Sequence, residues 1–375
     1  MRFILICLCS LLSLNSSAQK QTVKLYNSLA QERKDEVVSL SWNEIIATYP
    51  DLDPANFKVI NAVSKAELPF QLEYKGTPQL QNLLVQVSIP AKGSLSLKLV
   101  KGKHKAFQAK TFARYVPERK DDFAWENDRI AFRMYGKALE KFPNEMAYGV
   151  DVWTKRTDSL IVNKWYKSET YHTDKGEGMD YYNVGHTLGA GDNAPYINDT
   201  IRFPKNYTKW KVLDNGPLRS TFQLSYDEWL ASGRMVNVVK TISIDAGSQL
   251  SRTEAEYSWN DAKPLPVVVG IAKRPANGMI SLNEKDGIMA YWEPTDPKNG
   301  TTGTGCIFTA PVKQMQVKQG SLLTETVLTK PSSIVYYNGA AWDRAGRITS
   351  AEVWIKYLNQ KAEALKNPIE VSFVR

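Results

Sequence analysis

Hydrophobic residues alternate with polar residues along much of the chain, which is the pattern of half-buried β-strands. The clearest alternating apolar positions are Leu83, Val85, Val87 and Ile89; Leu95, Leu97 and Leu99; Ile130, Phe132 and Met134; Phe222, Leu224 and Tyr226; and Ile369, Val371 and Phe373. Turn-forming runs rich in Gly, Pro, Asn and Asp separate such segments, for example residues 214–217 and 296–300. The pattern predicts stacked antiparallel sheets.

A segment near the C-terminus has helical spacing instead of alternation. Its apolar residues share one helical face and are Ala351, Trp354, Ile355, Leu358, Ala362 and Leu365. Thr349 and Glu352 have the spacing of a capping box, and Pro368 lies just past the last periodic residue. We expect one amphipathic helix, packed on a sheet close to the C-terminal strand.

The length of the chain suits one large two-sheet domain with a smaller module attached. A basic stretch at residues 101–105 and a charged stretch at residues 118–122 mark the seam between them. We predict an N-terminal β-module at residues 19–110 and a large β-sandwich that carries the functional site at residues 111–375. The predicted fold class is mainly β, a large antiparallel β-sandwich with an N-terminal β-module and one C-terminal amphipathic helix.

The first residues have the features of a secretory signal peptide. A positive start at Arg2 precedes an apolar stretch at residues 3–14 and small residues at 16–18, which predicts a signal peptide at residues 1–18. Its removal leaves Cys306 as the single cysteine, so an internal disulfide is excluded. No later run reaches the ~18 apolar residues of a membrane span. We expect a periplasmic or secreted protein without a membrane span.

The chain is moderately basic, with 48 Lys and Arg against 39 Asp and Glu and a formal net charge of +9. For an exported protein this charge favours an acidic oligosaccharide or polysaccharide as partner, although ordinary solubility also explains it. The 10 Trp and 18 Tyr suit the apolar faces of sugar rings as well as a protein core. We expect neither nucleic acid nor an obligate protein partner.

Proton-transfer side chains are densest at residues 171–182. This segment contains His172, three carboxylates and three tyrosines around two glycines, and a second histidine, His186, follows shortly after it. Glycines permit positive φ angles and close approach to a ligand, so the composition indicates a shaped active-site loop. A solvated polar connector is the alternative.

A lyase acting on a uronate polymer needs a cation for the substrate carboxylate, a base for the C5 proton and an acid for the leaving oxygen. Arg129, His172 and Tyr182 could fill these roles in that order. Tyr182 would be a base only if Arg129 or a neighbouring lysine lowered its pKa.

A hydrolase needs two carboxylates that flank the bond, and Glu177 with Asp180, or Asp174 with Glu126, are the candidate pairs. Asp174, Glu177 and Asp180 also offer three oxygen ligands to a hard cation, so calcium is possible, although the spacing is not that of an EF-hand and no cofactor is required. The chain has no Gly-x-Ser-x-Gly elbow, phosphate loop or dinucleotide fingerprint, which excludes those enzyme classes.

Five further residues are candidates for substrate binding: Asp128, Arg129, His186, Arg219 and Trp342. A surface ion pair with an aspartate is the structural alternative for Arg129, a turn before a strand for Arg219, and a place in the core for Trp342. The sequence leaves these alternatives open.

Residues 123–136, 171–192, 216–219 and 336–342 resemble a family of exported bacterial proteins, domain of unknown function 4861. This family is common in Bacteroidetes and is often encoded near, or fused to, enzymes that degrade pectin-type polysaccharides. The resemblance covers roughly residues 22–375 and implies a carbohydrate context and a super-sandwich similar to galactose mutarotase. His186 departs from the family's loop pattern, so His172 is the better candidate of the two.

The sequence therefore favours a carbohydrate-active enzyme, a polysaccharide lyase or a glycoside hydrolase. It would cleave acidic, pectin-like oligosaccharides or polysaccharides by β-elimination or hydrolysis. The alternative is a non-catalytic carbohydrate-binding or mutarotase-like protein of the same pathway. The number of ionisable groups around His172 exceeds what a binding platform needs, which favours the enzyme.

Overall fold

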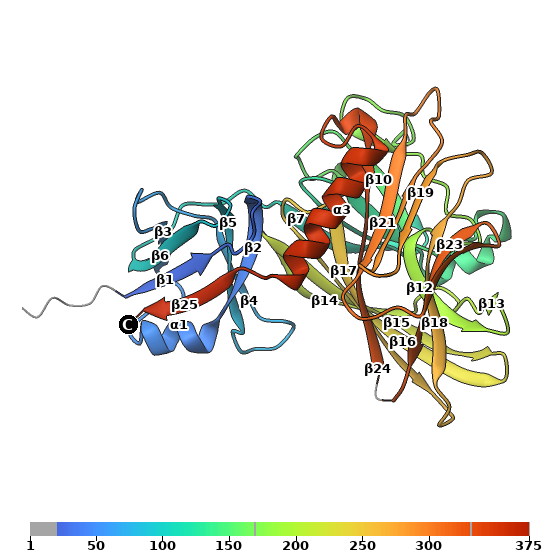
Figure 1. Cartoon of the computed structure of the whole chain (residues 1–375), viewed down its shortest axis with the longest axis horizontal. Coiled ribbons are helices and arrows are strands. Elements are labelled where there is room, and N and C mark those ends of the chain that lie inside the picture. The colour runs from blue at the N-terminus through green and yellow to red at the C-terminus, as the bar shows by residue number, and fades with distance from the viewer. Residues whose placement is uncertain (1–20, 169, 331, 375) are drawn as a thin grey trace, which may run out of the picture.

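The computed structural model describes residues 21–168, 170–330 and 332–374. The predicted signal peptide, residues 1–18, lies outside the described residues. Figure 1 shows a small β-module at one end of the molecule and a large layered β-sandwich at the other. An extended connection, which follows residue 101, leads from the module into the sandwich.

The N-terminal module contains two small antiparallel sheets around a core of its own. The first sheet contains, in spatial order, β25 (Glu370–Val374), β1 (Thr22–Tyr26), β6 (Ser94–Lys101) and β3 (Phe57–Asn61). The second contains β2 (Arg33–Ser41), β5 (Asn82–Ile89) and β4 (Phe70–Glu73). The alternating apolar residues of β5 all enter this core, as the sequence pattern predicts. A short helix that the sequence did not predict, α1 (Trp42–Thr48), adds Trp42 and Ile45 to the core.

One layer of the sandwich is an antiparallel sheet of eight strands, the large sheet. Its strands, in spatial order, are β14 (Lys209–Gly216), β15 (Arg219–Ala231), β16 (Arg234–Asp245), β17 (Leu250–Trp259), β24 (Ser332–Trp342), β21 (Thr302–Phe308), β20 (Ile288–Trp292) and β19 (Met279–Asn283). The long strands β15 and β16 form a hairpin whose alternating residues face the core and the outside in turn.

Two five-stranded sheets form the opposite layer. The β9 sheet contains β11 (Gly178–Asp180), β10 (Asp151–Lys155), β9 (Ala131–Met134), β8 (Asp122–Asn127) and β7 (Thr111–Val116). The β18 sheet contains β13 (Thr200–Ile201), β12 (Ala190–Ile197), β18 (Leu265–Ala272), β23 (Ser321–Leu328) and β22 (Gln314–Lys318). A bridge between Val150 and Gly189 connects the two sheets. One continuous core joins both to the large sheet, with Phe132, Val267 and Phe222 as members from the three sheets.

The predicted C-terminal helix is α3 (Ala351–Lys366), which packs on the outer face of the large sheet against β20 and β21. Trp354 anchors it, because its Nε1 donates a hydrogen bond to the backbone oxygen of Thr304 at 3.0 Å. The predicted capping box at Thr349 and Glu352 is wrong. Ser350 is the N-cap residue, and its Oγ accepts a hydrogen bond from the backbone N–H of Val353. The helix thus begins one residue later than the box requires.

Beyond α3 the chain returns to the N-terminal module as β25, which pairs with β1 in antiparallel register. A division at residue 110 therefore does not account for residues 370–374, which complete the first sheet of the module. The alternation of Ile369, Val371 and Phe373 indicates a strand but does not identify the strand it pairs with. Tertiary packing makes that choice.

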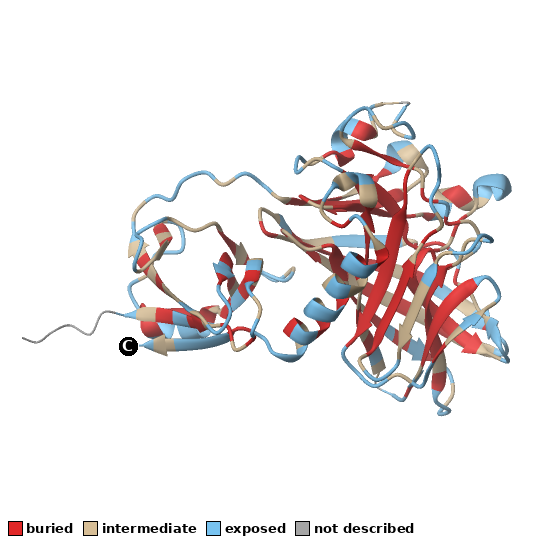
Figure 2. Ribbon diagram, turned by 45° about the horizontal axis from the view of Figure 1, so that its top comes forward, coloured by how far each residue is buried: buried red, intermediate tan, exposed pale blue. Residues whose placement is uncertain are grey.

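The mainly β fold, with its antiparallel sandwich and C-terminal helix, is confirmed. Figure 2 shows buried residues concentrated in the strands of the sandwich, whereas the outward face of α3 and most loops are exposed. Cys306 is a free, buried thiol in this core. Within the described ranges, none of the helices has the length and apolar composition needed to cross a membrane.

Candidate functional site

The outer face of the β9 sheet carries charged residues in the middle of its strands. In β9, Phe132 faces the core, so strand alternation turns Arg133 to the opposite face. Arg133 there contacts Asp122 from β8, Asp151 from β10 and Asp180 from β11. We call these four residues the Arg133 cluster. The sheet thus joins groups from four different strands on one face.

The Arg133 cluster is almost fully buried, with Arg133 6% exposed and none of the three carboxylates above 3%. Nε and Nη2 of Arg133 donate to Oδ2 of Asp151 at 2.9 and 2.6 Å. Nη2 also donates to Oδ2 of Asp180 at 3.0 Å, and Nη1 to Oδ2 of Asp122 at 3.4 Å. The hydroxyl of Tyr166 donates to Asp122 at 3.1 Å. One guanidinium is therefore shared by three carboxylates.

This arrangement raises the pKa of all three carboxyls. Burial raises the pKa of Asp122 to about 6, while Arg133 and Arg119 act in the opposite direction. Burial likewise raises the pKa of Asp151, against the effect of Arg133. Burial, and then the charge of Asp151, raise the pKa of Asp180 well above its ordinary value.

The chain after β10 folds over this face of the sheet. It includes the short helix α2 (Val162–Trp165) and packs an aromatic cluster on Trp153. The ring centroid of Trp153 lies 5.6 Å from that of Trp165, 4.9 Å from that of Tyr166 and 5.1 Å from that of Tyr171. These contacts keep the segment in place above the Arg133 cluster and separate the cluster from solvent.

The following turn has a shape that its glycines and one aspartate determine. Gly178 has φ of +119°, and a Cβ at this position would lie 2.0 Å from the backbone oxygen of Thr154. Oδ1 of Asp174 accepts hydrogen bonds from the backbone N–H groups of Gly176 at 2.8 Å and Gly178 at 3.0 Å. The carboxylate of Asp174 also forms an ion pair with Arg156. Asp174 therefore stabilises the turn that leads into β11.

Two of the predicted catalytic residues, His172 and Asp180, lie together. The backbone N–H of Asp180 donates to the backbone oxygen of Tyr171 at 2.9 Å, which brings the two ends of the turn together. Nδ1 of His172 lies 2.9 Å from the backbone oxygen of Asp180 and 3.6 Å from its Oδ2. A carbonyl oxygen only accepts, so a neutral His172 carries its proton on Nδ1 and leaves Nε2 as an acceptor. The imidazole is 61% exposed and can meet a ligand.

A cavity of about 340 Å³ lies within the same segment. Its lining includes the aromatic side chains of Trp165 and Tyr171 and the charged side chains of Lys164, Lys175 and Glu177. Nζ of Lys164 lies 2.7 Å from a carboxylate oxygen of Glu177. Two cations against one carboxylate give this cavity a positive balance, and the ring of Tyr171 is in contact with that of His172.

Tyr182 does not join this site. Its side chain belongs to the sandwich core, and its hydroxyl has no hydrogen-bond partner within the part of the chain that the structure describes. The cation over its ring is Arg274, at 4.5 Å, rather than Arg129. Burial and then Glu293 raise the pKa of Tyr182 well above its ordinary value, although Arg274 acts to lower it. The buried hydroxyl and its raised pKa therefore do not favour Tyr182 as a catalytic base.

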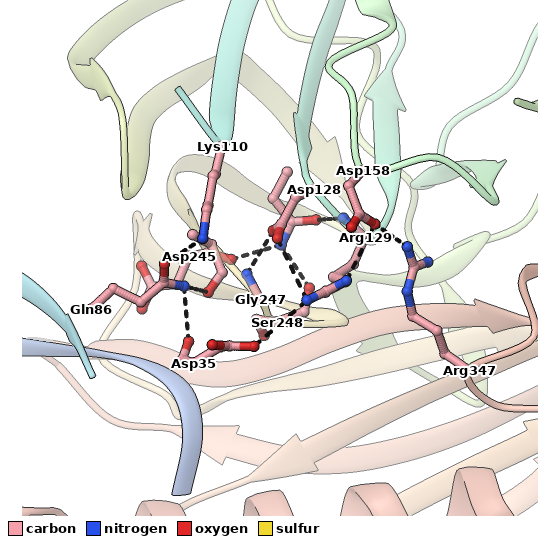
Figure 3. Close-up of polar contacts among 12 residues, drawn as sticks. Asp35, Gln86, Lys110, Asp128, Arg129, Asp158, Asp245, Gly247, Ser248 and Arg347 are labelled. Carbon is pink, nitrogen blue, oxygen red and sulfur yellow. Dashed lines mark hydrogen bonds and ion pairs between the residues drawn. The ribbon is translucent and has the colours of Figure 1, made fainter. Parts of the chain in front are cut away.

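Arg129 and Asp128 lie in the turn between β8 and β9, where the module and the sandwich meet. Figure 3 shows Arg129 among three carboxylates, at 3.3 Å from Asp158, 3.7 Å from Asp128 and 3.8 Å from Asp35 of the N-terminal module. Asp128 accepts a hydrogen bond from the backbone N–H of Gly247 at 2.7 Å. The ion pair considered as the alternative for Arg129 is present, and it connects the two bodies of the molecule.

Arg219 has a similar connecting position. Its Nε and Nη2 donate to both carboxylate oxygens of Asp245 at 2.5 and 2.7 Å. Its Nη1 donates to Glu73 of the N-terminal module at 3.1 Å. Arg219 also lines a cavity between the two bodies, which lies apart from residues 171–180.

Trp342 and His186 have opposite environments. Trp342 is 1% exposed, and its Nε1 donates to the backbone oxygen of Asn299 at 2.9 Å, so it has no ring face to offer a sugar. The interpretation of Trp342 as a core residue is the one that this packing supports. His186 is exposed, and its ring centroid lies 5.4 Å from that of Tyr148.

The acidic residues of the predicted loop do not converge on one point. Asp174, Glu177 and Asp180 each pair with a different basic residue, and the described residues contain no group of three or more potential ligands placed to hold a metal ion. Glu126, the other predicted hydrolytic carboxylate, is buried and accepts a hydrogen bond from Nζ of Lys155 at 2.8 Å. Spacing along a loop does not show in which direction each side chain turns.

Sequence reasoning missed Arg133, Asp122 and Asp151. A signal was present in β9, where Arg133 stands between Phe132 and Met134, two apolar residues that face the core. An arginine on the opposite face of such a strand must meet either water or buried acids. The acids themselves lie in other strands, so only the folded chain identifies them.

A family model described as "Domain of unknown function (DUF4861)" matches residues 25–371. Among curated proteins, the "Uncharacterized protein P7" of Formosa agariphila is 29% identical over 378 residues, which span 95% of this chain and 94% of the relative. The resemblance of the sequence to this family is thus confirmed, whereas the association with pectin stays a prediction.

Two solved structures share the fold. An alpha-mannosidase from Enterococcus faecalis V583 has 11% identity and a TM-score of 0.51, over 96% of this chain and 46% of the other. A protein in the glycosyl hydrolase family 38 from Enterococcus faecalis has 12% identity and a TM-score of 0.51, over 96% of this chain and 48% of the other. The chain spans just under half the length of these structures. At such identity the likeness shows the fold alone.

Proposed function

The chain belongs to the family described as domain of unknown function (DUF4861), and from this premise we propose that it is a carbohydrate-active enzyme that cleaves uronate-containing oligosaccharides. The observation that carries the proposal is the geometry of His172, an exposed imidazole whose Nδ1 is fixed by Asp180 and whose Nε2 points away from that contact. The solved structures that share the fold are named as a mannosidase and a glycosyl hydrolase family 38 protein, which agrees with a carbohydrate substrate.

The site supports β-elimination better than hydrolysis. Hydrolysis needs two carboxylates around the bond, yet Asp174 and Glu177 are held in ion pairs and Asp180 is 3% exposed. Elimination needs one base, one acid and a cationic environment for the substrate carboxylate. In the proposed site the exposed imidazole is the base, the hydroxyl of Tyr171 is the acid and Lys175 is the cation.

In this reaction Nε2 of His172 accepts the C5 proton of the uronate. The C4–O bond breaks as the C4=C5 double bond forms, and the hydroxyl of Tyr171 donates a proton to the leaving oxygen. Lys175, which lines the adjoining cavity, attracts the uronate carboxylate, whereas Lys164 is paired with Glu177. Asp180 acts through His172 and is a positioning residue: its backbone oxygen selects the tautomer that leaves Nε2 free to accept.

The test is to incubate the protein with pectic, glucuronan, alginate and ulvan oligosaccharides while product masses and the absorbance of unsaturated uronates are followed together. We expect new absorbance without a mass gain of water. His172→Ala should lower turnover by about 10²–10⁴-fold, the usual contribution of a general base. His104→Ala, which removes an exposed histidine of the connection after β6, is the matched control and should keep full turnover.

Other outcomes would replace this proposal. A mass gain of one water without new absorbance would indicate a glycoside hydrolase. Binding of these oligosaccharides without any product would indicate the non-catalytic, sugar-binding or mutarotase-like alternative. Full turnover in His172→Ala would show that the base lies elsewhere.

Export belongs to the same proposal. The signal peptide expected at residues 1–18 would place the enzyme in the periplasm or outside the cell, where acidic polysaccharides are accessible. N-terminal sequencing of the protein from the producing cells should give a start close to Gln19, whereas an intact Met1 in the cytoplasmic fraction would contradict export.

A further inference from the structure

A second cavity lies between the N-terminal module, the outer face of the large sheet and the C-terminal half of α3. It has a volume of about 530 Å³ and is lined from all three sides. Glu36 and Glu73 come from the module, Ser243 and Arg252 from the large sheet, and Lys361 from α3. We call it the intermodule cavity. None of its lining residues belongs to the Arg133 cluster or to residues 171–180.

The floor of the intermodule cavity is a row of side chains in register across four strands. Thr221 of β15 lies opposite Ser243 of β16, Ser243 opposite Arg252 of β17, and Arg252 opposite Tyr337 of β24. Neighbouring strands are ~4.8 Å apart, so the row extends over about 14 Å. Two hydroxyls, a guanidinium and a phenol thus form one continuous polar strip.

A second row runs beside the first. Thr241 lies opposite Glu254, and both line the cavity. The carboxylate of Glu254 accepts a hydrogen bond from Nη2 of Arg252 at 3.0 Å, which orients both planar groups over the floor. Leu213 and Leu250 add apolar surface to the lining. The cavity therefore combines hydroxyls, planar charged groups and aliphatic walls.

The charges that line the intermodule cavity are balanced. Its five basic residues are Arg33, Lys75, Arg219, Arg252 and Lys361, and its five acidic residues are Asp35, Glu36, Glu73, Asp245 and Glu254. Most of them form ion pairs with one another, as Arg33 does with Glu36 and Arg219 does with Asp245. A lining with balanced charge gives a polyanion no net electrostatic attraction. A neutral ligand does not depend on such attraction.

Contacts around the cavity fix the two bodies in their relative positions. The side-chain oxygen of Gln71 accepts hydrogen bonds from the backbone N–H groups of Leu218 and Arg219, at 2.8 Å each. Asp214 accepts from the backbone N–H groups of Tyr74 and Lys75 at 2.8 and 2.7 Å. The cavity is thus formed before any ligand arrives, which lowers the entropic cost of binding.

Figure 3 shows one end wall of the intermodule cavity. Asp35, Asp245, Gly247 and Ser248 line the cavity there, and Arg129 lies beside them with its guanidinium 3.8 Å from Asp35. The network in this view keeps the wall polar on the cavity side. It also explains the position of Arg129, which stabilises the wall without lining the cavity.

We propose that the intermodule cavity binds a neutral saccharide, distinct from the acidic sugar proposed for the cavity beside His172. Planar charged side chains held in ion pairs offer fixed donors and acceptors to the hydroxyl groups of a sugar, and the aliphatic walls and Tyr337 suit its C–H faces. The balanced charge gives a uronate no net attraction, in contrast to the two lysines and one glutamate of the other cavity. The inference goes beyond the proposed catalytic function and does not depend on it.

The experiment measures binding by isothermal titration calorimetry with neutral disaccharides and trisaccharides of glucose, galactose, mannose, xylose, arabinose and rhamnose, and with a uronate trisaccharide for comparison. Ser243→Trp places an indole in the middle of the floor and should weaken binding of the neutral saccharide at least tenfold. Ser225→Trp, further along the same face of β15 and outside the cavity, is the matched control and should bind like the unmodified protein.

Arg252→Ala is a second variant for the case in which the tryptophan disturbs the fold, and it too should weaken binding at least tenfold. His172→Ala should bind the neutral saccharide with unchanged affinity, because His172 does not line this cavity. The two proposals can therefore fail independently of each other. The proposal is overturned if no neutral saccharide of the panel binds. It is also overturned if Arg252→Ala and a folded Ser243→Trp bind with unchanged affinity.

Discussion

The two five-stranded sheets present similar faces to the core and opposite faces to the outside. Inside, Phe132 of the β9 sheet and Val267 of the β18 sheet enter the same core. Outside, the β18 sheet buries an apolar cluster that includes Val268 and Leu323, whereas the β9 sheet buries the Arg133 cluster. The two sheets thus differ in the charge of their outer faces, although the β9 sheet also buries an apolar cluster around Trp153 beside the Arg133 cluster.

The two outer faces contribute differently to the stability of the fold. Burying apolar side chains stabilises a sheet by about 25 cal/mol per Å² of apolar area, and the β18 sheet closes its layer in this way. Burying ions costs free energy that ion pairs only partly offset. The β18 sheet buries an ion pair of Asp192 with Lys240, whereas the β9 sheet buries three carboxylates around one guanidinium. This larger concentration of charge lies next to the proposed site at His172.

The largest effect is expected from Arg133→Met, which removes the cation and leaves three buried carboxylates. The unfolding free energy at pH 7 should fall by about 3–5 kcal/mol, as for other buried ion pairs that lose one partner. Denaturant unfolding of both proteins measures this loss of unfolding free energy. Arg252→Met is the control, because Arg252 is 37% exposed and pairs with a partly exposed glutamate, so its loss should cost ~0–1 kcal/mol. Equal losses in the two variants would contradict the comparison.

The next effect is expected from Leu323→Ala on the outer face of the β18 sheet. Leu323 is fully buried, so the cavity should cost about 3 kcal/mol of stability. Turnover per folded molecule should not change, because this face has no part in the proposed site. A folded Leu323→Ala protein with greatly reduced turnover would show that both outer faces serve function.

Asp122→Asn tests the charged face through its pH dependence. Burial raises the pKa of Asp122 to about 6, so between its unfolded pKa and pH 6 the folded protein holds a proton that the unfolded chain has lost. Asp122 therefore lowers stability as pH rises through this window, by roughly 1–3 kcal/mol in total. Asn does not titrate, so the variant should gain stability relative to the unmodified protein between pH 4 and pH 7. Parallel stability curves would exclude the raised pKa.

The smallest effect on stability is expected from His172→Ala. The imidazole is 61% exposed, so unfolding free energy should change by less than about 0.5 kcal/mol, although turnover should fall strongly. Thermal unfolding and turnover measured on one preparation compare the two quantities. A large loss of stability would instead make His172 a structural residue of the turn.

Local patterns were sufficient for much of the fold. Alternation places the apolar residues of β5 in the core of the module, and helical spacing predicts α3 with its apolar face on a sheet. These predictions succeed because alternation and helical period depend on residues close in sequence. The cap at Ser350 and the pairing of β25 with β1 were missed, since both depend on how the chain meets other elements.

The candidate site was predictable only in part. Glycine spacing identified the turn before β11, where Gly178 has no room for a side chain, and composition identified His172. Tyr182 was misplaced because a tyrosine in a polar run can turn towards the core as easily as towards solvent. Trp342 is also buried, on the face of β24 opposite α3, because its neighbour Ala341 belongs to the apolar cluster under α3 and side chains alternate along the strand.

By itself, the sequence determined which faces of the strands are apolar, where the C-terminal helix lies and which turn collects ionisable groups. Only the tertiary structure decided which charges meet. Arg133 and Asp180 are 47 positions apart in the chain, and their contact follows from the order β11–β10–β9 in one sheet. Periodicity is a local property of the chain, whereas the energy of a buried charge depends on partners that only the folded chain brings within a few ångströms.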